Sequence, residues 1–384
     1  MDKNKQYKIA LVLYTQGLDY DDRIRKEILS IQKLFPNISF KIFAVEPKNR
    51  EEEGLTSYGV PYRIPFLRTR EKYASASHTM AKAWDFYKTI KHDLKQFDAI
   101  WCADPETFIF VLMIHGKPIA WDLHELPGRF MHKPIWKMLF RFAEKKVRVM
   151  IHANEPRLKH LQSLGIVRQP VKQFVLRNYP QFNEIDSEYD ETYQQFDTWL
   201  GTAKCVYLQG IVDERRADRE SVEAVMAIEG LKAVVVGSTR SDLIPYLKTK
   251  YSDQELSERL FFTGRIKQLK TPQYIRRCFM SLIFYKNISA NNWYCEPNRL
   301  FQNIINGNPV VVGNNPPMKE LVEKYDIGIC ADTDGNELSS IVVAIKQLIS
   351  RYDEIKQNLS IASQHLIWDD QEETIVKIVN KFLI

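Results

Sequence analysis

The sequence lacks the motifs of several common protein classes. No apolar run approaches the roughly 18 residues that a membrane-spanning helix needs. No apolar stretch with a small-residue cleavage site follows Met1, so we expect a cytoplasmic protein. The five cysteines are scattered and form no CxxC pair, which argues against a zinc site or a disulfide framework. Neither GxGxxG nor a phosphate loop ending in Gly-Lys-Ser/Thr is present, so dinucleotide enzymes and P-loop NTPases are not expected.

Length and composition predict two globular domains. The chain has 384 residues, 45% of them hydrophobic and 27% charged, which is enough apolar material for two cores. Charge is unevenly distributed, because residues 1–180 contain 31 Lys and Arg against 19 Asp and Glu, whereas the remainder contains 23 against 29. A basic first half indicates an anionic partner: a phosphate-bearing substrate, nucleic acid or an anionic membrane face. Ordinary surface charge is the alternative.

Short apolar runs alternate with amphipathic segments along both halves, which predicts two parallel α/β sheets. We expect one domain at 1–180, a polar connection at 178–200, a second domain at 200–360, and a terminal helix at 361–384 that packs back toward the first domain. The predicted strands are 7–14, 40–45, 99–102, 119–123, 149–153 and 174–176, then 204–208, 232–236, 260–262, 280–284, 310–312 and 328–330. The main predicted helices are 21–34, 134–146, 221–229, 272–278, 297–306, 318–324 and 338–351.

The segment from 291 to 311 carries the most specific local pattern. Pro297 suits the first position of a helix, and Gly307 suits its end. Leu300, Phe301, Ile304 and Ile305 form an apolar stripe, and the opposite face is polar, with Arg299, Gln302, Asn303 and Asn306. A helix start with free N–H groups beside an arginine favours an anion site, although a capped surface helix has the same pattern.

This segment resembles the donor-binding segment of glycosyltransferase family 4, whose members often read Pro-Asn-Lys-Leu-Phe-Glu before a Gly-x-Pro-Val turn. Here the run is Pro297-Asn298-Arg299-Leu300-Phe301-Gln302, then Gly307-Asn308-Pro309-Val310. The resemblance implies the GT-B fold, in which two Rossmann-like doubly wound domains face each other across a cleft. Gln302 stands where the family has a ribose-binding glutamate. Glu296 lies near Tyr294, which occupies the position of the family's second glutamate.

Other stretches resemble the same family in the same order. Trp121-Asp122-Leu123-His124-Glu125 is similar to its Asp-x-His-Glu strand end, which implies catalytic roles for His124 and Glu125. The remaining similar positions are implied donor-binding residues, and Asp104, which follows a predicted strand, is a weaker candidate. The implied donor-binding residues are Gly17, Arg216, Gly237, Gly264, Arg265, Glu296, Asn298, Arg299 and Gln302.

The segment from Met131 to Lys146 is basic, aromatic and amphipathic. Such a helix either packs on its own sheet or rests on an anionic membrane face. The sequence alone leaves both readings open.

The resemblance implies a retaining transferase that moves a sugar from a nucleotide-diphosphate sugar to a glycan or lipid-linked acceptor, in polysaccharide or glycoconjugate synthesis. We expect no metal or other cofactor and no nucleic-acid partner. The alternative is a catalytically inactive GT-B partner or regulatory subunit, because Gln302 replaces the glutamate and Ile211 replaces an arginine frequent after Gly210. A sugar-nucleotide epimerase is less favoured, because no acid/base carboxylate pair is identified for it.

Overall fold

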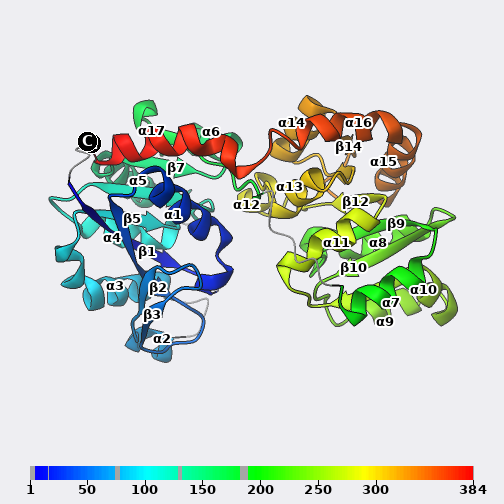
Figure 1. Cartoon of the computed structure of the whole chain (residues 1–384), viewed down its shortest axis with the longest axis horizontal. Helices are drawn as coiled ribbons and strands as arrows, with labels where there is room; N and C mark the ends of the chain where they lie inside the picture. The colour runs from blue at the N-terminus through cyan, green and yellow to red at the C-terminus, as the bar shows by residue number, and fades with distance from the viewer. Residues whose placement is uncertain (1–4, 16, 74–77, 129–131, 182–188, 384) are drawn as a thin grey trace. The chain divides into compact units, whose positions relative to one another are not determined.

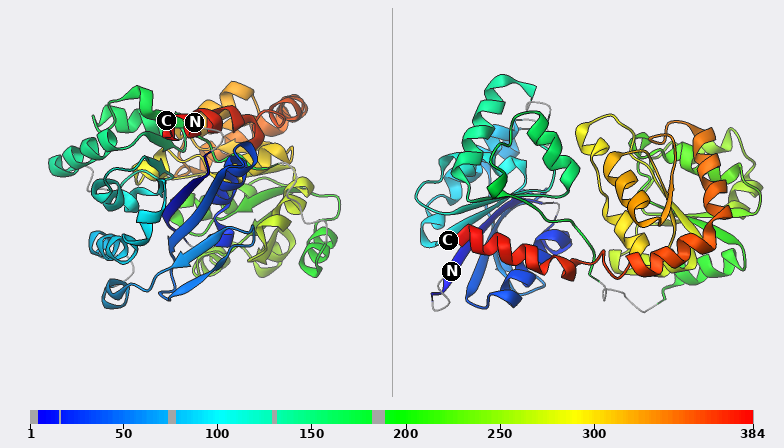
Figure 2. Two further views of the ribbon diagram at one scale, coloured as in Figure 1. Left: turned by 60° about the vertical axis from the view of Figure 1, so that its left-hand side comes forward. Right: turned by 90° about the horizontal axis from the view of Figure 1, so that it is seen from above.

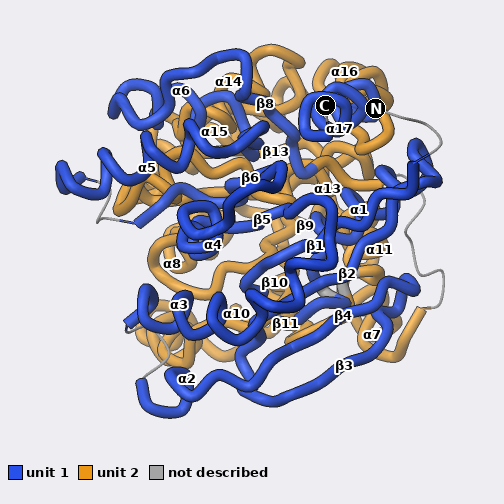
Figure 3. Tube along the Cα trace, turned by 90° about the vertical axis from the view of Figure 1, so that its left-hand side faces the viewer, with its two compact units in different colours: residues 1–178, 371–384 blue, residues 179–370 orange. Residues whose placement is uncertain are grey.

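The chain folds into two compact units in a computed structural model (Figure 1), which describes residues 5–15, 17–73, 78–128, 132–181 and 189–383. Unit 1 comprises residues 1–178 and 371–384, and unit 2 comprises residues 179–370 (Figure 3). The chain therefore crosses between the units twice. Within the described ranges, no helix is both long enough and apolar enough to cross a membrane.

Unit 1 is built on an eight-stranded sheet in the order β3-β4-β2-β1-β5-β6-β7-β8, parallel except for the β3–β4 pair. The central strands are apolar and buried along nearly their whole length, as expected for a sheet that helices cover on both faces. Its strands are β1 (Tyr7–Tyr14), β2 (Ile38–Val45), β3 (Glu52–Leu55), β4 (Pro61–Ile64), β5 (Ala99–Ala103), β6 (Ile119–Leu123), β7 (Val149–His152) and β8 (Gln173–Val175). Its helices are α1 (Asp22–Leu34), α2 (Arg68–Lys72), α3 (Thr79–Ile90), α4 (Phe108–Met113), α5 (Pro134–Lys146), α6 (Glu155–Ser163) and α17 (Glu372–Leu383).

The C-terminal helix α17 belongs to unit 1 and packs against α1, β7 and β8 (Figure 2, red). The ring of Phe382 meets Trp101 of β5 edge-on, with 5.6 Å between the ring centroids. Lys33 of α1 forms an ion pair with Glu372 at 2.6 Å. The last residues of the chain thus complete the core of the first unit.

Unit 2 has a six-stranded parallel sheet in the order β11-β10-β9-β12-β13-β14. In chain order within the unit this is 3-2-1-4-5-6, the doubly wound order, which reverses between β9 and β12. Its strands are β9 (Lys204–Gln209), β10 (Leu231–Val236), β11 (Leu260–Gly264), β12 (Met280–Ile283), β13 (Val310–Val312) and β14 (Gly328–Cys330). Its helices are α7 (Glu191–Leu200), α8 (Asp218–Met226), α9 (Leu243–Lys248), α10 (Asp253–Arg259), α11 (Thr271–Arg277), α12 (Ala290–Trp293), α13 (Asn298–Ile305), α14 (Pro316–Tyr325), α15 (Leu338–Ser350) and α16 (Tyr352–Ala362).

The predicted strands and main helices are all present, with ends shifted by a few residues. Two expectations are wrong in detail, and one hairpin was not predicted. The connection expected at 178–200 contains helix α7, whose Phe196 is fully buried in a core with Tyr207 and Tyr274. The hairpin β3–β4 was not predicted, because its strands are short and mostly solvent-facing. Pro297 is the N-cap of α13 rather than its first helical residue.

Candidate functional site

In unit 2, Arg299 links the two strands that flank the point where the sheet order reverses. Its Nη1 donates to the carbonyl oxygen of Gln209, the last residue of β9, and its Nη2 donates to that of Phe284 at 3.3 Å, just beyond β12. Ligands of doubly wound sheets bind at this reversal, beyond the carboxyl ends of the strands. Arg299 therefore places a buried positive charge where a ligand is expected.

Helix α13 holds Arg299 through an internal hydrogen-bond network. The Nδ2 of Asn303, one turn later, donates to the carbonyl oxygen of Arg299 at 2.7 Å, and Asn308 Nδ2 donates to Asn303 Oδ1 at 2.7 Å. Arg299, Asn303 and Asn308 are all buried. The polar face that we expected on this helix is therefore only partly exposed to solvent. Asn303 and Asn308 bond each other inside the fold, whereas Arg299 Nε is buried without a hydrogen-bond partner among the described residues.

A second arginine lies beside the first. The guanidinium carbons of Arg216 and Arg299 lie 5.3 and 5.0 Å from the ring centroid of Tyr285, within the range of cation–π contacts. Arg216 Nη1 also donates to the carbonyl oxygen of Gly210 at 2.8 Å. Burial lowers the pKa of Arg299, and the nearby charge of Arg216 lowers it further. Two like charges held this close favour an anion between or beside them.

These arginines differ from their neighbours, because no carboxylate in the described part of the chain pairs with them. Three neighbouring arginines each form an ion pair with an aspartate. Arg219 pairs with Asp242 at 3.0 Å, Arg240 pairs with Asp218 at 2.9 Å, and Arg215 pairs with Asp213. Among the residues that the structure describes, neither Arg216, Arg265 nor Arg299 forms such a pair. Arg265 instead donates from Nε to Ser238 Oγ at 3.0 Å. The region around the reversal point thus carries positive charge that no described carboxylate neutralises.

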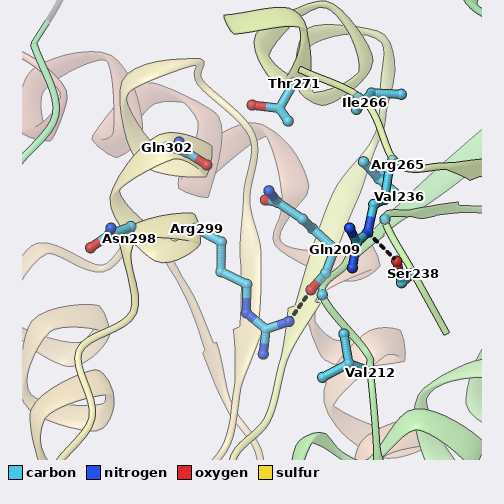
Figure 4. A pocket seen from close by; sticks show the side chains of 12 residues that line it. Gln209, Val212, Val236, Ser238, Arg265, Ile266, Thr271, Asn298, Arg299 and Gln302 are labelled. Carbon is cyan, nitrogen blue, oxygen red and sulfur yellow. Dashed lines mark hydrogen bonds between the residues drawn. The ribbon is translucent and has the colours of Figure 1, made fainter. Parts of the chain in front are cut away.

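A cavity of about 480 Å³ opens at this place, within unit 2 (Figure 4). Residues of α13 form one wall. The other is formed by the ends of β9 and β10, the loops beyond β9, β10 and β11, and Thr271 of α11. Its size is in the range of small-molecule sites. The lining residues are Gln209, Gly210, Val212, Val236, Gly237, Ser238, Arg265, Ile266, Thr271, Asn298, Arg299 and Gln302.

The structure brings five of the predicted donor-binding residues to this cavity and leaves four outside its lining. Gly237, Arg265, Asn298, Arg299 and Gln302 line it. The others are placed as follows: Arg216 is bonded to the lining residue Gly210, Gly264 accepts a 3.0 Å backbone bond from Gly237, Glu296 is half-buried before α13, and Gly17 lies in unit 1.

Seven lining residues were not among the predicted donor-binding residues: Gln209, Gly210, Val212, Val236, Ser238, Ile266 and Thr271. A signal existed for Gly210, because glycine after a strand often marks close backbone approach to another group. Gly210 has φ +63, and a Cβ at this position would lie 2.9 Å from Arg216 Nη1. Thr271 follows a helical turn that shows no motif.

Unit 1 carries a second group of polar residues at the carboxyl ends of its strands. Arg23 of α1 forms a bidentate pair with Asp122 of β6, at 3.1 Å from Nε and 2.9 Å from Nη2. Its Nη1 donates to the carbonyl oxygen of Leu176 at 2.8 Å, and its Nε lies 3.0 Å from Glu27 Oε1. Arg23, Glu27 and Asp122 are buried, so the geometry of this group is fixed by charge pairing.

His124 lies between two carboxylates of this group. Its Nε2 is 2.7 Å from Asp122 Oδ2, and its Nδ1 is 3.3 Å from Asp104 Oδ1. Asp104 has φ +71, a strained conformation for a residue other than glycine, and such strain concentrates at functional sites. Glu125, the other predicted catalytic residue, is exposed. Both nitrogens of His124 are thus engaged, which favours a fixed imidazolium over a free proton carrier.

The pKa shifts in this group follow from burial and pairing. Burial alone would lower the pKa of His124, but Asp122 and Asp104 outweigh it and raise that pKa well above its ordinary value. Burial alone would raise the pKa of Asp122, but Arg23 and His124 hold it well below the usual range. Burial and the charge of Asp122 raise the pKa of Glu27. The group therefore holds His124 charged and Asp122 ionised.

Glu27, Asp122 and His124 are the described residues that could jointly contact a metal ion, since their ligand atoms lie within 4.8 Å of one another. The guanidinium of Arg23 already contacts both carboxylates, at 3.0 and 2.9 Å. The arrangement fits an internal ion-pair network better than a cation site.

The structure is similar over almost its whole length to solved structures of sugar-transferring enzymes. A sucrose-phosphate synthase from Thermosynechococcus elongatus superimposes with a TM-score of 0.75 at 12% identity, over 98% of this chain and 99% of that one. HepE from Anabaena, solved in complex with UDP, superimposes with a TM-score of 0.70 at 14% identity, over 97% of this chain and 99% of that one. A glycosyltransferase from Rickettsia africae superimposes with a TM-score of 0.71 at 12% identity, over 99% of each chain.

The chain has the GT-B fold. No protein-family model matches the sequence, and no curated protein matches it either. At these identities the similarity establishes the GT-B architecture, with its two parallel-sheet units, and leaves the chemistry to be argued from the residues. The cavity of unit 2 lies at the reversal point of its sheet.

Asp122→Asn should lower the free energy of unfolding by about 3–5 kcal/mol, because it leaves Arg23 buried without its partner. It should also move the pKa of His124 down toward its ordinary value. The stabilisation that a raised histidine pKa contributes is fully present below the unfolded-state pKa of about 6.5, and it disappears as the pH rises through the folded-state pKa. Because the folded-state pKa of His124 is lower in the variant, the variant should lose this stabilisation at a lower pH than the wild type. Urea unfolding and NMR titration of labelled histidine measure both effects.

The matched control is Asp98→Asn, which breaks an exposed pair with Lys5 and should cost less than about 1 kcal/mol. Equal losses in the two variants, or an unchanged His124 titration, would contradict the network described above.

Gly210→Ala should destabilise unit 2 more than Gly230→Ala, by about 1 kcal/mol. Both positions have positive φ, 63° and 78°, so both variants acquire backbone strain. Only at Gly210 would the new Cβ displace Arg216 from its carbonyl bond, because nothing lies within 4 Å of a Cβ at Gly230. Denaturant titration compares the two variants, and equal losses would show that Arg216 does not depend on this glycine.

Proposed function

We propose that the protein is a glycosyltransferase that uses a nucleotide-diphosphate sugar as donor. One observation carries the proposal: Arg299 and Arg216 lie over the ring of Tyr285 at the reversal point of the unit 2 sheet, beside a cavity, and no described carboxylate pairs with either. A diphosphate leaving group would supply the missing negative charge. Preorganised cations stabilise the charge that develops on such a leaving group without requiring a metal ion.

The rest of the cavity suits a nucleoside and a sugar. Gln302, one turn after Asn298, presents an amide that can donate to and accept from hydroxyl groups. The turn at Gly237 leaves the backbone open to close approach, because it has φ +102 and no side chain. We assign the nucleoside to Gln302, Gly237 and Gly264, and the diphosphate to Arg216, Arg265 and Arg299.

Structural neighbours support the class of donor. HepE is solved in complex with UDP and with UDP-glucose. The E. coli trehalose-6-phosphate protein is solved with UDP-2-fluoro glucose. We extend this donor class to the present chain because its cavity carries the positive charge that a diphosphate needs.

On the acceptor side, we propose that His124 acts as a fixed imidazolium near the reacting sugar, with Glu125 and Gly17 on the same unit. We further propose transfer with retention to a glycan or lipid-linked acceptor, in polysaccharide or glycoconjugate synthesis. The family resemblance of the sequence supports these assignments, and the basic character of residues 1–180 agrees with an anionic partner. A lipid-linked acceptor would bring the protein to the cytoplasmic face of a membrane.

Isothermal titration calorimetry with UDP, GDP and their sugar conjugates should show one diphosphate nucleotide binding per chain. Arg265→Ala should weaken this binding about tenfold or more, because it removes a charge-assisted contact. Arg276→Ala is the matched control, since that arginine is exposed and bonds Asn306 outside the cavity lining. An absence of binding to every diphosphate, or equal effects in the two variants, would contradict the proposal.

Arg299→Ala should abolish turnover, with a loss of about a hundredfold or more in kcat, because removing one group that stabilises developing charge costs that much in other enzymes. Release of the nucleoside diphosphate from the donor identified by calorimetry provides the assay. Because Arg299 also ties β9 to β12, circular dichroism must show that the variant is folded. A folded variant with normal turnover would refute the assignment.

A catalytically inactive GT-B partner is the second candidate. Ile211 stands where family members often carry an arginine, and its apolar side chain is buried in the hydrophobic core and supplies no charge for a phosphate. Gln302 also lacks the charge of the usual glutamate. Calorimetry separates the candidates in one respect: an empty cavity with every diphosphate favours the inactive partner.

A further inference from the structure

Helix α5 of unit 1 has two apolar faces, and only one of them is covered. Phe140, Ala143 and Glu144 are buried on the inner side, where the ring of Phe140 stacks on Phe108 at a centroid distance of 4.6 Å. Ile135, Met138 and Phe142 recur at i, i+3 and i+7, so they form one stripe along the opposite side. Their exposed fractions are 53%, 56% and 54%. The inner face thus packs as one of the two sequence-based readings expects, and the opposite face is exposed to solvent.

The exposed face of α5 carries positive charge and no negative charge. Lys145, in the last turn, is exposed and continues the stripe of Ile135, Met138 and Phe142, and Lys133, the N-cap residue, is exposed at the start of the helix. Lys137 is half-exposed and lies on the side of Glu144, outside the stripe. Within the described part of the chain, none of these three lysines forms an ion pair. The one acidic residue of the helix, Glu144, is 1% exposed and accepts hydrogen bonds from the backbone nitrogens of Arg168 and Gln169 at 2.7 and 2.8 Å.

The same character continues past the C-terminal end of the helix. Lys172 Nζ donates to the carbonyl oxygen of Lys145 at 3.0 Å, which places the turn at 170–172 against this end. Val171 in that turn is 71% exposed, and Arg148 and Arg168 are exposed as well. Figure 3 shows α5 at an outer edge of unit 1. The surface thus combines exposed apolar side chains with cations on a helix about 20 Å long.

We propose that α5 and the turn at 170–172 form a docking surface for an anionic lipid bilayer. Apolar side chains on a convex helix face insert into the boundary between headgroups and acyl chains, while lysines beside them contact lipid phosphates. Exposed apolar residues flanked by cations, with the acidic residue turned inward, match this environment in both polarity and charge. The helix would lie parallel to the membrane surface, with Ile135, Met138 and Phe142 toward the lipid.

Flotation of the full-length protein with liposomes provides the test. The probes are vesicles of phosphatidylcholine alone and equimolar mixtures of phosphatidylcholine with phosphatidylglycerol. The protein should float with the anionic vesicles and not with the neutral ones at about 0.1 M salt, and high salt should release much of it. Met138→Ser with Phe142→Ser should reduce binding about tenfold, because two inserted apolar side chains are lost. Lys133→Glu with Lys145→Glu should reduce it by a similar factor.

Val343→Ser with Ile361→Ser provides the matched control, because these side chains are 54% and 63% exposed on helices of unit 2. All three double variants change exposed positions, so their melting temperatures should equal that of the wild type, and the control should bind vesicles normally. No preference for anionic vesicles would overturn the proposal, and so would equal binding by all variants. A dimer in solution that Met138→Ser with Phe142→Ser dissociates would also overturn it, because a second copy would then cover this face.

The test does not involve turnover. Vesicle binding without nucleotide binding would leave the docking surface standing and remove the proposed reaction, and nucleotide binding without vesicle binding would do the reverse.

Discussion

The candidate site of unit 2 depends on a guanidinium group that joins two strand ends. Arg299 donates to the carbonyl oxygens of Gln209 and Phe284, so it fixes the geometry of the unit 2 sheet where its strand order reverses. The same group carries a charge that no carboxylate among the described residues neutralises. A buried, unpaired cation is costly unless a ligand completes it. This cost is the physical reason to expect an anion in the adjoining cavity.

The buried cation of unit 1 is neutralised by the protein itself. This cation, Arg23, is neutralised by Asp122, and that pair in turn holds His124 in its charged form. The result is a rigid polar group that needs no ligand to be stable. Unit 2 therefore has buried positive charge that no described carboxylate neutralises. In unit 1 the buried charges neutralise one another and hold a fixed imidazolium. This contrast supports assigning the diphosphate to unit 2.

The sequence allowed much of the fold to be predicted, because the strands are continuous apolar runs separated by amphipathic helices. Helix α7 was missed since its neighbours at 178–190 are polar and hide its periodicity. Arg299 was predicted as an anion-binding residue, but its bonds to strand ends could not be foreseen from local pattern. The Arg23–Asp122 pair joins residues 99 positions apart, and only the folded sheet brings them together. Contacts of that range lie outside any motif.

The most direct measurement of the central claim compares the affinities of a nucleoside diphosphate, its monophosphate and the free nucleoside for the wild-type protein. If the unpaired arginines bind the diphosphate, the diphosphate should bind about a hundredfold more tightly than the nucleoside, since each charge-assisted contact contributes roughly 1.5–3 kcal/mol. This advantage should shrink as salt is added. Equal affinities for the three compounds would contradict the account.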